Sequence, residues 1–539
     1  MFLQRITVTL LPILLVQICL IVSGKVFYEE CRSHMGKEFV LIFTDNSRHS
    51  NLLRLYITTP LNESFTIHVE TPLLSQINQD FVVTNGTKLV IELPIDLAIS
   101  RTTKSNKTIL VTAQNFIVLF ASNMQHNGGD SYIIHPIAVL STEHISVNLK
   151  TKSGIYHSVT SVVAIADQTE VDIALPTGSV VEFDGIIYTS GSTLSVSLNK
   201  YEVFQFTSSD DLSGTILTSN YPVAAFSGHE LGNPEISSQT SIDMVYEMLV
   251  PTIYWSTYYI AISNPVFDSG EGELIRVFTS GDNTNIMINT SGTLDQISIS
   301  TKASYHEFHL PLSEAAVITS DKPVLVSQIT AAKQIAGSYT GDARLVLPSP
   351  VNAWLSEYSF NTPGENMYNG LVLLTDSNSL INITLNEKSL NSSILWKKIE
   401  GTNFIYTSIQ LSEGVHTLTC ISAASKCWGY VYGIHSLEEY GTSIGRSFSQ
   451  KTADSSNFNQ IKSSVLEFKD NGLLFDTPIF NTVSRSLVGC IKLCRIYSCS
   501  IVSFRSADGS CFLYTDEDRC GSIKLSSDFK LYFVRKSNF

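Results

Sequence analysis

Charged residues are scarce in this chain: Lys, Arg, Asp and Glu make up 16% of its 539 residues, and the formal net charge is −14. The sequence has no basic stripe that could neutralise phosphates, which argues against a nucleic-acid partner. The same negative balance argues against a purely electrostatic attachment to anionic membranes. Helical periodicity is almost absent from residues 25–440, where Thr, Ser, Val, Ile, Tyr and Phe favour strands.

Sequence motifs of catalysis and metal binding are also missing. There is no Gly-x-Ser-x-Gly elbow, no phosphate-binding glycine-rich loop and no His-Glu-x-x-His. His306 and His309 have the nearest metal-like spacing, but residues three apart on an alternating strand point to opposite faces. The paired carboxylates Asp210-Asp211 and Glu438-Glu439 lie in predicted turns or in a linker, where we expect them to be solvated. We therefore predict no enzyme activity, no catalytic residues, no metal and no cofactor.

One long apolar run occurs, at the amino terminus. Residues 1–24 carry Arg5, an apolar run over Leu10–Val22 and a small-residue exit at Gly24, which is typical of a secretory signal peptide. The alternative, a membrane anchor, needs a longer apolar core. The polar tail Lys524–Phe539 does not suit a lipid-anchor signal. We predict cleavage near Gly24 and a secreted, extracellular protein without a membrane anchor.

Cysteine and glycosylation patterns fit the same compartment. Loss of Cys19 with the signal peptide leaves eight of the nine cysteines, an even number as oxidising compartments prefer. Cys420 and Cys427 lie at the ends of adjacent predicted strands and are expected to bridge each other. The predicted N-glycosylation sites are the asparagines of six Asn-x-Ser/Thr sequons: Asn62, Asn85, Asn106, Asn289, Asn382 and Asn391.

A twelve-residue pattern recurs at residues 109–120, 215–226 and 316–327. Each copy is an apolar run, a short polar kink and a second apolar run, and a hairpin signal precedes each one. A fourth copy of the whole module, shorter than the other three, runs from Leu371 to about Ile434. We predict an all-β fold of tandem repeated β-sheet modules of about a hundred residues. This size favours sandwich-like modules, and propeller-like blades are the alternative.

The composition changes after the repeats. Residues 436–464 are rich in Ser, Gly, Thr, Asn and Gln, which is typical of a linker. Five of the eight remaining cysteines then fall between Cys490 and Cys520, so a short cysteine-rich unit follows a long cysteine-poor one. The predicted organisation is a signal peptide at 1–24, a repeated β domain at 25–440, a linker at 441–464 and a small domain at 465–539.

Several phrases in order resemble a known family. They are Gly36-Lys-Glu-Phe-Val, the stretch from Asp211 to Glu230, Met248-Leu-Val-Pro, Gly429-Tyr-Val-Tyr-Gly and Glu439-Tyr-Gly. Over about 30–445 the chain resembles the amino-terminal domain of the IgGFc-binding protein family. The resemblance implies that the β domain is that family's domain.

Two departures from that family bear on function. Leu231 and Ile242 stand where the family commonly has a cysteine pair. The chain also lacks the long cysteine-rich von Willebrand D arrays of the family's large mucus-associated member. Immunoglobulin binding and covalent mucin networking therefore do not carry over from the resemblance.

The carboxyl-terminal unit resembles a small α+β PAN/apple domain stapled by disulfides. Its features are a helix capped by Ser484 with one face formed by Leu487, Cys490, Ile491 and Cys494, then Cys499, a strand with Cys511 and a closing strand at 530–534. The resemblance implies the pairs Cys494–Cys499 and Cys490–Cys511. Cys31 and Cys520 remain, and they either join the two ends of the chain or form a disulfide-linked oligomer.

The leading interpretation is a secreted glycoprotein that acts as an extracellular binding or adhesion protein in matrix, mucus or innate defence. Its partner would be an extracellular protein or glycan, and exposed aromatic side chains would be natural anchors. Tyr430, Tyr432 and Tyr514 are the candidate anchors. The alternatives are a carbohydrate-active enzyme with an unrecognised acid pair, and a structural component of a secreted coat or adhesive.

Overall fold

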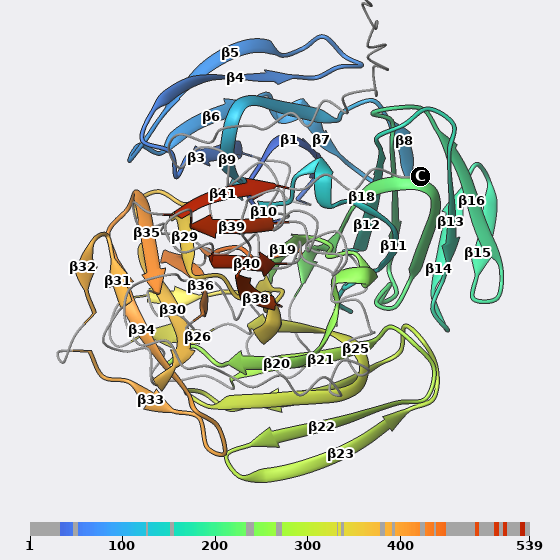
Figure 1. Cartoon of the computed structure of the whole chain (residues 1–539). Helices are drawn as coiled ribbons and strands as arrows, with labels where there is room; N and C mark the ends of the chain where they lie inside the picture. Colours follow the sequence, from blue (N-terminus) through green and yellow to red (C-terminus); the bar gives the residue numbers. More distant parts are fainter. Residues whose placement is uncertain are drawn as a thin grey trace, which may run out of the picture. The chain divides into compact units, whose positions relative to one another are not determined.

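The computed structural model describes residues 33–46, 52–125, 128–150, 156–232, 242–265, 272–330, 333–335, 339–377, 383–390, 394–420, 426–435 and 438–448, and four strands between residues 480 and 533. The chain forms two compact units, and the larger one is Cys31–Thr452. Strands, turns and short 3-10 helices make up the described residues, and none of those residues is in an α-helix (Figure 1). The predicted all-β class is therefore confirmed.

The repeated phrase forms the longest strands of the fold. They are β9 (Ile109–Gln125), β18 (Ile216–Gly232) and β25 (Ala315–Thr330). Each of these strands belongs to two layers, because its two halves pair with different neighbours. Figure 1 shows β18 and β25 curving from one layer to the next.

The second module, residues 137–248, shows how the two layers form. Residues 216–219 of β18 pair with β11 (Ser141–Ile145) and β13 (Thr169–Ala174). Residues 223–229 pair instead with β12 (Ser158–Ala164) and β19 (Asp243–Met248). Pro222 lies between the halves and has no N–H to donate to a ladder, so the strand changes layer there. Such curled sheets, sharing one strand, make the predicted sandwich-like module.

The remaining strands repeat this plan. Module 1 has β1 (Gly36–Leu41), β3 (Leu52–Thr58), β4 (Ser64–Glu70), β5 (Asn78–Thr84), β6 (Leu89–Leu93) and β10 (Gly128–Ile134), with short β2 (Phe43–Thr44), β7 (Ala98–Ile99) and β8 (Thr103–Ser105). Module 2 adds β14 (Val180–Phe183), β15 (Ile186–Thr189), β16 (Thr193–Leu198) and β17 (Val203–Ser208). Module 3 has β20 (Ser256–Ile262), β21 (Glu273–Thr279), β22 (Thr284–Thr290), β23 (Thr293–Ile299), β24 (Tyr305–Leu310), β26 (Lys333–Ile335), β27 (Tyr339–Gly341) and β28 (Arg344–Val346).

In module 4 the long strand is divided into two. Its strands are β29 (Glu357–Asn361), β30 (Tyr368–Asp376), β31 (Ile383–Leu385), β32 (Lys388–Ser389), β33 (Lys397–Lys398), β34 (Phe404–Leu411), β35 (Val415–Cys420), β36 (Cys427–His435) and β37 (Glu438–Ser443). β35 and β36 take the places of the two halves of the bent strand, in one layer each. The predicted Cys420–Cys427 disulfide is present and joins the two halves, with 6.2 Å between the Cα atoms.

Short proline turns connect successive modules. Pro136, Pro251 and Pro350 each precede a single 3-10 turn, η3 (Ile137–Val139), η4 (Thr252–Tyr254) and η5 (Val351–Ala353). After η4 and η5 an indole N–H donates back to a carbonyl before the proline, Trp255 to Val250 and Trp354 to Ser349 at 3.0 Å each. The fixed φ of proline and this hydrogen bond set the angle between consecutive modules.

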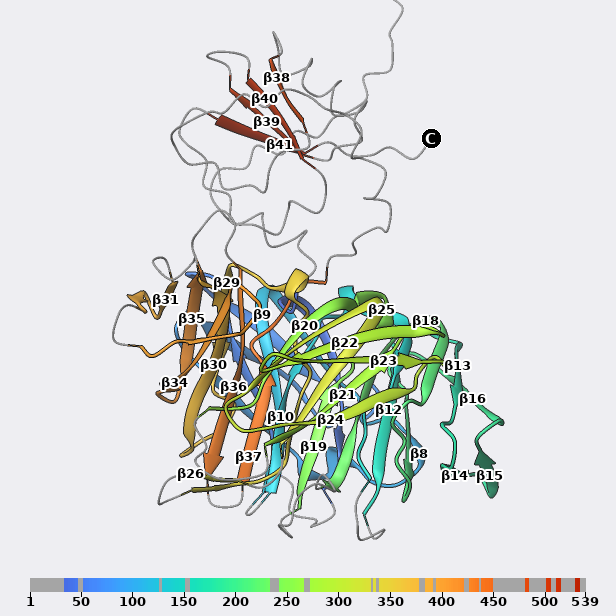
Figure 2. The same cartoon turned by 90° about the horizontal axis from the view of Figure 1, so that it is seen from below.

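The last strands of the four modules meet at the centre of the large unit, in a group that we call the hub. β10 packs against β19 and β37, and β28 packs against the same two strands. Figure 2 shows β10, β19 and β37 side by side. Apolar clusters are shared by modules 1 and 2, 2 and 3, 3 and 4, and 4 and 1, so the packing closes into a ring.

The two ends of the large unit meet at this closure. Ser33 and Ser447 form an isolated antiparallel β-bridge, and the His34 N–H donates to the Arg446 carbonyl at 3.0 Å. The Arg446 N–H donates in return to His34 Nδ1 at 3.2 Å. The large unit thus extends beyond residue 440, the predicted end of the β domain. β37 ends at Ser443, and Ser447 still forms a bridge with Ser33.

In the second unit the structure describes one antiparallel sheet, in the order β38 (Phe480–Val483), β40 (Ser510–Tyr514), β39 (Ile501–Arg505), β41 (Phe529–Phe533). β40 and β41 lie where the strand with Cys511 and the closing strand are predicted. The predicted helix lies outside the described residues, as do Cys31, Cys490, Cys494, Cys499 and Cys520. The PAN/apple assignment and the linker at 441–464 stay predictions.

Replacing both bridged cysteines by alanine, Cys420→Ala with Cys427→Ala, is expected to lower the free energy of unfolding of the large unit. The disulfide closes a loop over a sequence separation of 7, and a loop this short is worth about 2.5 kcal/mol through the entropy of the unfolded chain. Urea unfolding of the full chain would measure the difference. An unchanged midpoint in the double variant would contradict this role for the bridge.

Candidate functional site

A groove with a volume of about 770 Å³ lies on module 2 of the large unit. One wall comes from β8 and the residues before it, and the other from the hairpin of β14 and β15. Thr207, Ser208, Ser209 and His157 form the floor. β8 belongs to module 1 in the chain, where it precedes β9, but it pairs with β17 of module 2, and this pairing places β8 beside the groove.

The hairpin wall forms a two-stranded sheet of its own, and its strands lie at the outer edge of module 2 (Figure 1). Asp184 and Gly185 form the turn with positive φ values of 50° and 74°, which is the conformation that an Asp-Gly hairpin turn favours. On the inner face, Val181 is buried and the Phe183 ring lies 4.8 Å from the Phe204 ring. The hairpin is therefore attached to the core by one face.

The other parts of the hairpin present aliphatic side chains to solvent. Val180 is 43% exposed, Ile186 is 55% exposed and Ile187 is 66% exposed. We call these three residues the hairpin patch. Val180 and Ile187 lie on one face of this two-stranded sheet, whereas Ile186, which is opposite Phe183, lies on the other. Single exposed apolar residues are common on protein surfaces, but a hairpin that exposes aliphatic side chains on both faces beside a groove is a candidate interaction site.

Charges of both signs line the groove. Arg101 and Lys104 lie on the β8 wall, and Glu182 and Asp184 lie on the hairpin wall. Lys104 Nζ donates to the Ser197 carbonyl at 3.0 Å, and His157 Nδ1 lies 3.1 Å from Glu230 Oε2. Mixed charges around an apolar patch resemble the rim and core of a protein interface.

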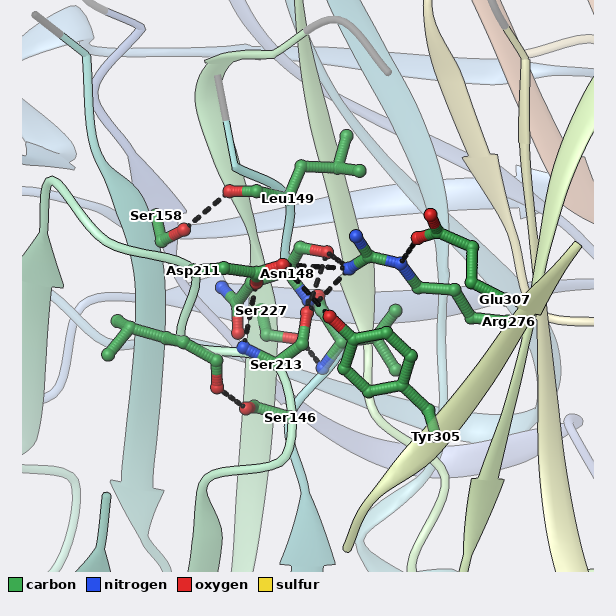
Figure 3. Close-up of polar contacts among 12 residues, drawn as sticks. Ser146, Asn148, Leu149, Ser158, Asp211, Ser213, Ser227, Arg276, Tyr305 and Glu307 are labelled. Atoms are coloured by element: carbon green, nitrogen blue, oxygen red, sulfur yellow. Dashed lines mark hydrogen bonds and ion pairs between the residues drawn. The ribbon is translucent and has the colours of Figure 1, made fainter. Parts of the chain in front are cut away.

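Arg276 of β21 joins module 3 to module 2 (Figure 3). Its Nε donates to Glu307 Oε2 at 2.7 Å, and its Nη1 donates to Asp211 Oδ2 at 3.0 Å. The same Nη1 lies 2.8 Å from the Asn148 carbonyl oxygen, and the guanidinium stacks over the Tyr305 ring, 4.6 Å from its centroid. Arg276 is buried, so these contacts replace the water that its charge loses.

Ser213 and Asn148 complete this network within module 2. Ser213 Oγ donates to the Asn148 carbonyl at 2.9 Å, and the Ser213 N–H donates to Asp211 Oδ1 at 2.9 Å. The Asn148 side-chain amide donates to the Val159 and Gly228 carbonyls at 2.8 and 2.7 Å. The network therefore holds the segment of Asp211 and Ser213, which begins two positions after the floor residue Ser209.

A second polar link between modules 2 and 3 lies on β11. Glu143 accepts hydrogen bonds from Lys302 Nζ at 2.5 Å and from Thr252 Oγ1 at 2.8 Å. Partial burial opposes ionisation of this carboxyl, but the bonds from Lys302 and Thr252 lower the pKa of Glu143 below its usual value. Its neighbour His144 is fully buried, and burial lowers the pKa of His144 to about 3. The imidazole is therefore neutral at physiological pH.

Several residues singled out in the sequence lie elsewhere than expected. Tyr430 and Tyr432 are buried in the core shared by modules 3 and 4, so the prediction that they anchor a ligand is wrong. Asp211 and Glu439 are paired with Arg276 and Arg344 instead of being solvated. Both errors have one cause: alternation along a strand does not show which face a neighbouring module covers.

The other predicted positions are placed as follows. The side chains of Asn62, Asn85 and Asn106 are exposed and Asn289 is half-buried, whereas Asn382 and Asn391 lie outside the described residues. Tyr514 is in β40, of which only the backbone course is described. His306 and His309 lie on β24. Within the described ranges, no three His, Cys, Asp or Glu side chains are grouped so that they could hold a metal ion.

One sequence feature that predicts part of the groove lies outside the repeated phrase. Val180-Val-Glu-Phe-Asp-Gly-Ile-Ile-Tyr-Thr is an apolar hairpin with an Asp-Gly turn. Its position beside β8 depends on pairing between β8 and β17, which are about a hundred residues apart. In the parts of the chain that the structure describes, no helix is long and apolar enough to span a bilayer.

Comparison with known proteins gives two findings. The family model described as IgGFc binding protein matches residues 130–433, more than half of the chain. The human protein named IgGFc-binding protein is 25% identical over 313 residues, which are 57% of this chain and 6% of the human protein. The matched residues include the hairpin wall and the floor of the groove and the Arg276 network, but not the β8 wall.

Arg276→Gln is expected to lower the free energy of unfolding by about 3 kcal/mol, because it leaves the largely buried Asp211 carboxylate without its cation. Chemical denaturation would measure the loss. Arg54→Gln is the matched control: Arg54 also joins two modules, through Glu92 and Glu365 at 3.3 and 3.0 Å, but it is partly exposed. Its loss should cost less than about 1 kcal/mol. Equal losses in the two variants would contradict the network's importance.

His144→Leu is expected to reduce the acid sensitivity of the protein. The folded pKa of His144 is about 3, below an unfolded value of about 6.5. Its contribution to stability is therefore present above pH ~6.5 and is lost as the pH falls toward the folded pKa. Between pH ~7.5 and ~5, the wild type should lose about 2 kcal/mol more unfolding free energy than the variant. Parallel curves for the two proteins over that range would refute the assignment.

Proposed function

The chain belongs to the IgGFc-binding protein family, and we propose that it is a secreted binding protein that recognises an extracellular protein ligand. The proposal covers adhesion or capture in matrix, mucus or host defence, and it assigns no enzyme activity. The signal-like amino terminus, the sequons and the Cys420–Cys427 disulfide support an extracellular site of action.

The observation that carries the proposal is the hairpin patch beside the groove. Val180 and Ile187 expose aliphatic side chains on one face of the hairpin and Ile186 exposes one on the other, and a partner that grips the hairpin can desolvate them. The acidic hairpin wall and the basic β8 wall can then orient the partner by charge. The Arg276–Asp211 pair holds the segment that follows the floor residues, and a preorganised site loses little conformational entropy on binding.

The chemistry of this surface favours a protein over a glycan. Its exposed apolar side chains are aliphatic, and the aromatic ring of the hairpin wall, Phe183, packs inward against Phe204. A sugar ring would gain most from a flat exposed aromatic face, whereas Phe183, which lines the groove, is half-buried. Aliphatic residues within a charged rim are better matched to a protein surface.

The name of the human relative identifies the first ligand to test, the Fc fragment of IgG. The chain spans only 6% of that protein. Fc binding by the human protein could therefore reside in parts that this chain does not match. A set of purified extracellular matrix proteins and a glycan array complete the screen. Binding to glycans alone would contradict the proposal.

Replacing both isoleucines, Ile186→Asp with Ile187→Asp, is expected to weaken binding of the protein ligand at least tenfold. Each buried aliphatic side chain contributes about 1.5–3 kcal/mol, and a tenfold change corresponds to about 1.4 kcal/mol. Biolayer interferometry with the full-length secreted protein would measure it. Leu294→Asp is the control, since Leu294 is 56% exposed on β23, away from the groove. Equal affinities for the double variant and the wild type would exclude the hairpin patch.

A further inference from the structure

A smaller pocket lies between modules 3 and 4, with a volume of about 190 Å³. Module 3 contributes Asn289, Ser291 and Glu314, and module 4 contributes Lys397, Lys398 and Glu400. The volume equals that of about six water molecules at ~30 Å³ each, which is the scale of one sugar ring. Its lining offers hydrogen-bond donors and acceptors from both modules.

Asn289 is oriented into this junction by its own hairpin turn. Its Oδ1 accepts the N–H of Gly292 at 3.2 Å, which fixes the amide plane. Its Nδ2 makes no hydrogen bond and points toward module 4, where it lies 3.5 Å from the place that a Cβ on Gly401 would occupy. The amide nitrogen that a glycosyltransferase modifies is therefore free and faces the pocket.

The sequence around Asn289 is a glycosylation sequon, Asn289-Thr290-Ser291. The other sequon asparagines that the structure describes differ from it. Asn62, Asn85 and Asn106 are exposed, and Asn85 Nδ2 donates to Asn62 Oδ1 at 3.3 Å. Among these four asparagines, Asn289 alone lines a pocket that has walls from two modules.

We propose that Asn289 carries an N-linked glycan whose first N-acetylglucosamine occupies this pocket and bridges modules 3 and 4. The proposal rests on passage through the secretory pathway, as the proposed function does. The sugar hydroxyls would bind the Lys397 and Lys398 ammonium groups and the Glu314 and Glu400 carboxylates. The Tyr406 hydroxyl already donates across this junction to the Ser313 carbonyl at 2.6 Å, so the sugar would extend an existing link.

The test uses the full chain secreted from mammalian cells that make only high-mannose glycans. Glycopeptide mass spectrometry should find Asn289 occupied. Asn289→Asp keeps the Oδ1 acceptor for Gly292 and removes the glycan, and it should lower the melting temperature by about 1–3 °C. Ser291→Ala removes the sequon with Asn289 intact and should have a similar effect. Asn106→Gln, which removes a glycan from an open surface, should leave the melting temperature unchanged.

Trimming with endoglycosidase H separates the first sugar from the rest of the glycan. The enzyme leaves one N-acetylglucosamine on each asparagine, so the trimmed wild type should melt at the same temperature as the untrimmed protein. An unoccupied Asn289 with occupied Asn62 or Asn106 would overturn the proposal while leaving secretion intact. Unchanged melting in both Asn289→Asp and Ser291→Ala would overturn it as well. Absence of glycan from every sequon would count against both this proposal and the proposed extracellular function.

Discussion

The hub of the large unit depends on buried carboxylates that satisfy backbone N–H groups across strands. β10, β19, β28 and β37 pack together without a backbone ladder between them in the described residues. Asp130 accepts the N–H groups of Tyr246 and Gly441, on two neighbouring strands, and Asp243 accepts the N–H of Gly129. A buried N–H without a partner would cost as much as a lost hydrogen bond. These side chains therefore allow four sheet edges to meet in a dry interior.

The buried ionisable groups of the hub are balanced by other groups that lie close to them. Burial raises the pKa of Asp130 and of Asp243, so these carboxyls resist ionisation even though backbone donors oppose the shift. Arg344 lies among them, fully buried and paired with Glu273 at 3.2 Å and with Glu439. The hub therefore fixes the modules at their inner edges, and the structure of the outer hairpins does not depend on it. The hairpin patch and the Asn289 turn are both such outer hairpins.

The sequence predicts the modules well and their contacts poorly, for a physical reason. The repeated phrase marks the bent strands because its apolar runs and polar kink are local properties, and Pro222 itself interrupts the ladder. Burial of Glu439, Asp211, Tyr430 and Tyr432 depends instead on which neighbour covers each strand. The groove depends on β8 crossing to the sheet of the next module. Such long-range pairings leave no periodic trace in a single sequence.

Module 4 explains why the fold itself favours an oxidising compartment. It closes the ring, because it shares one apolar cluster with module 3 and another with module 1. It is also the module whose bent strand is divided, so its two layers lack the continuous backbone that links the layers of modules 1 to 3. The Cys420–Cys427 bridge restores that link at the place of the division. A reducing compartment would remove this cross-link, and the peptide chain between Cys420 and Cys427 alone would then join the two layers. This argument for an extracellular protein is independent of the amino-terminal sequence.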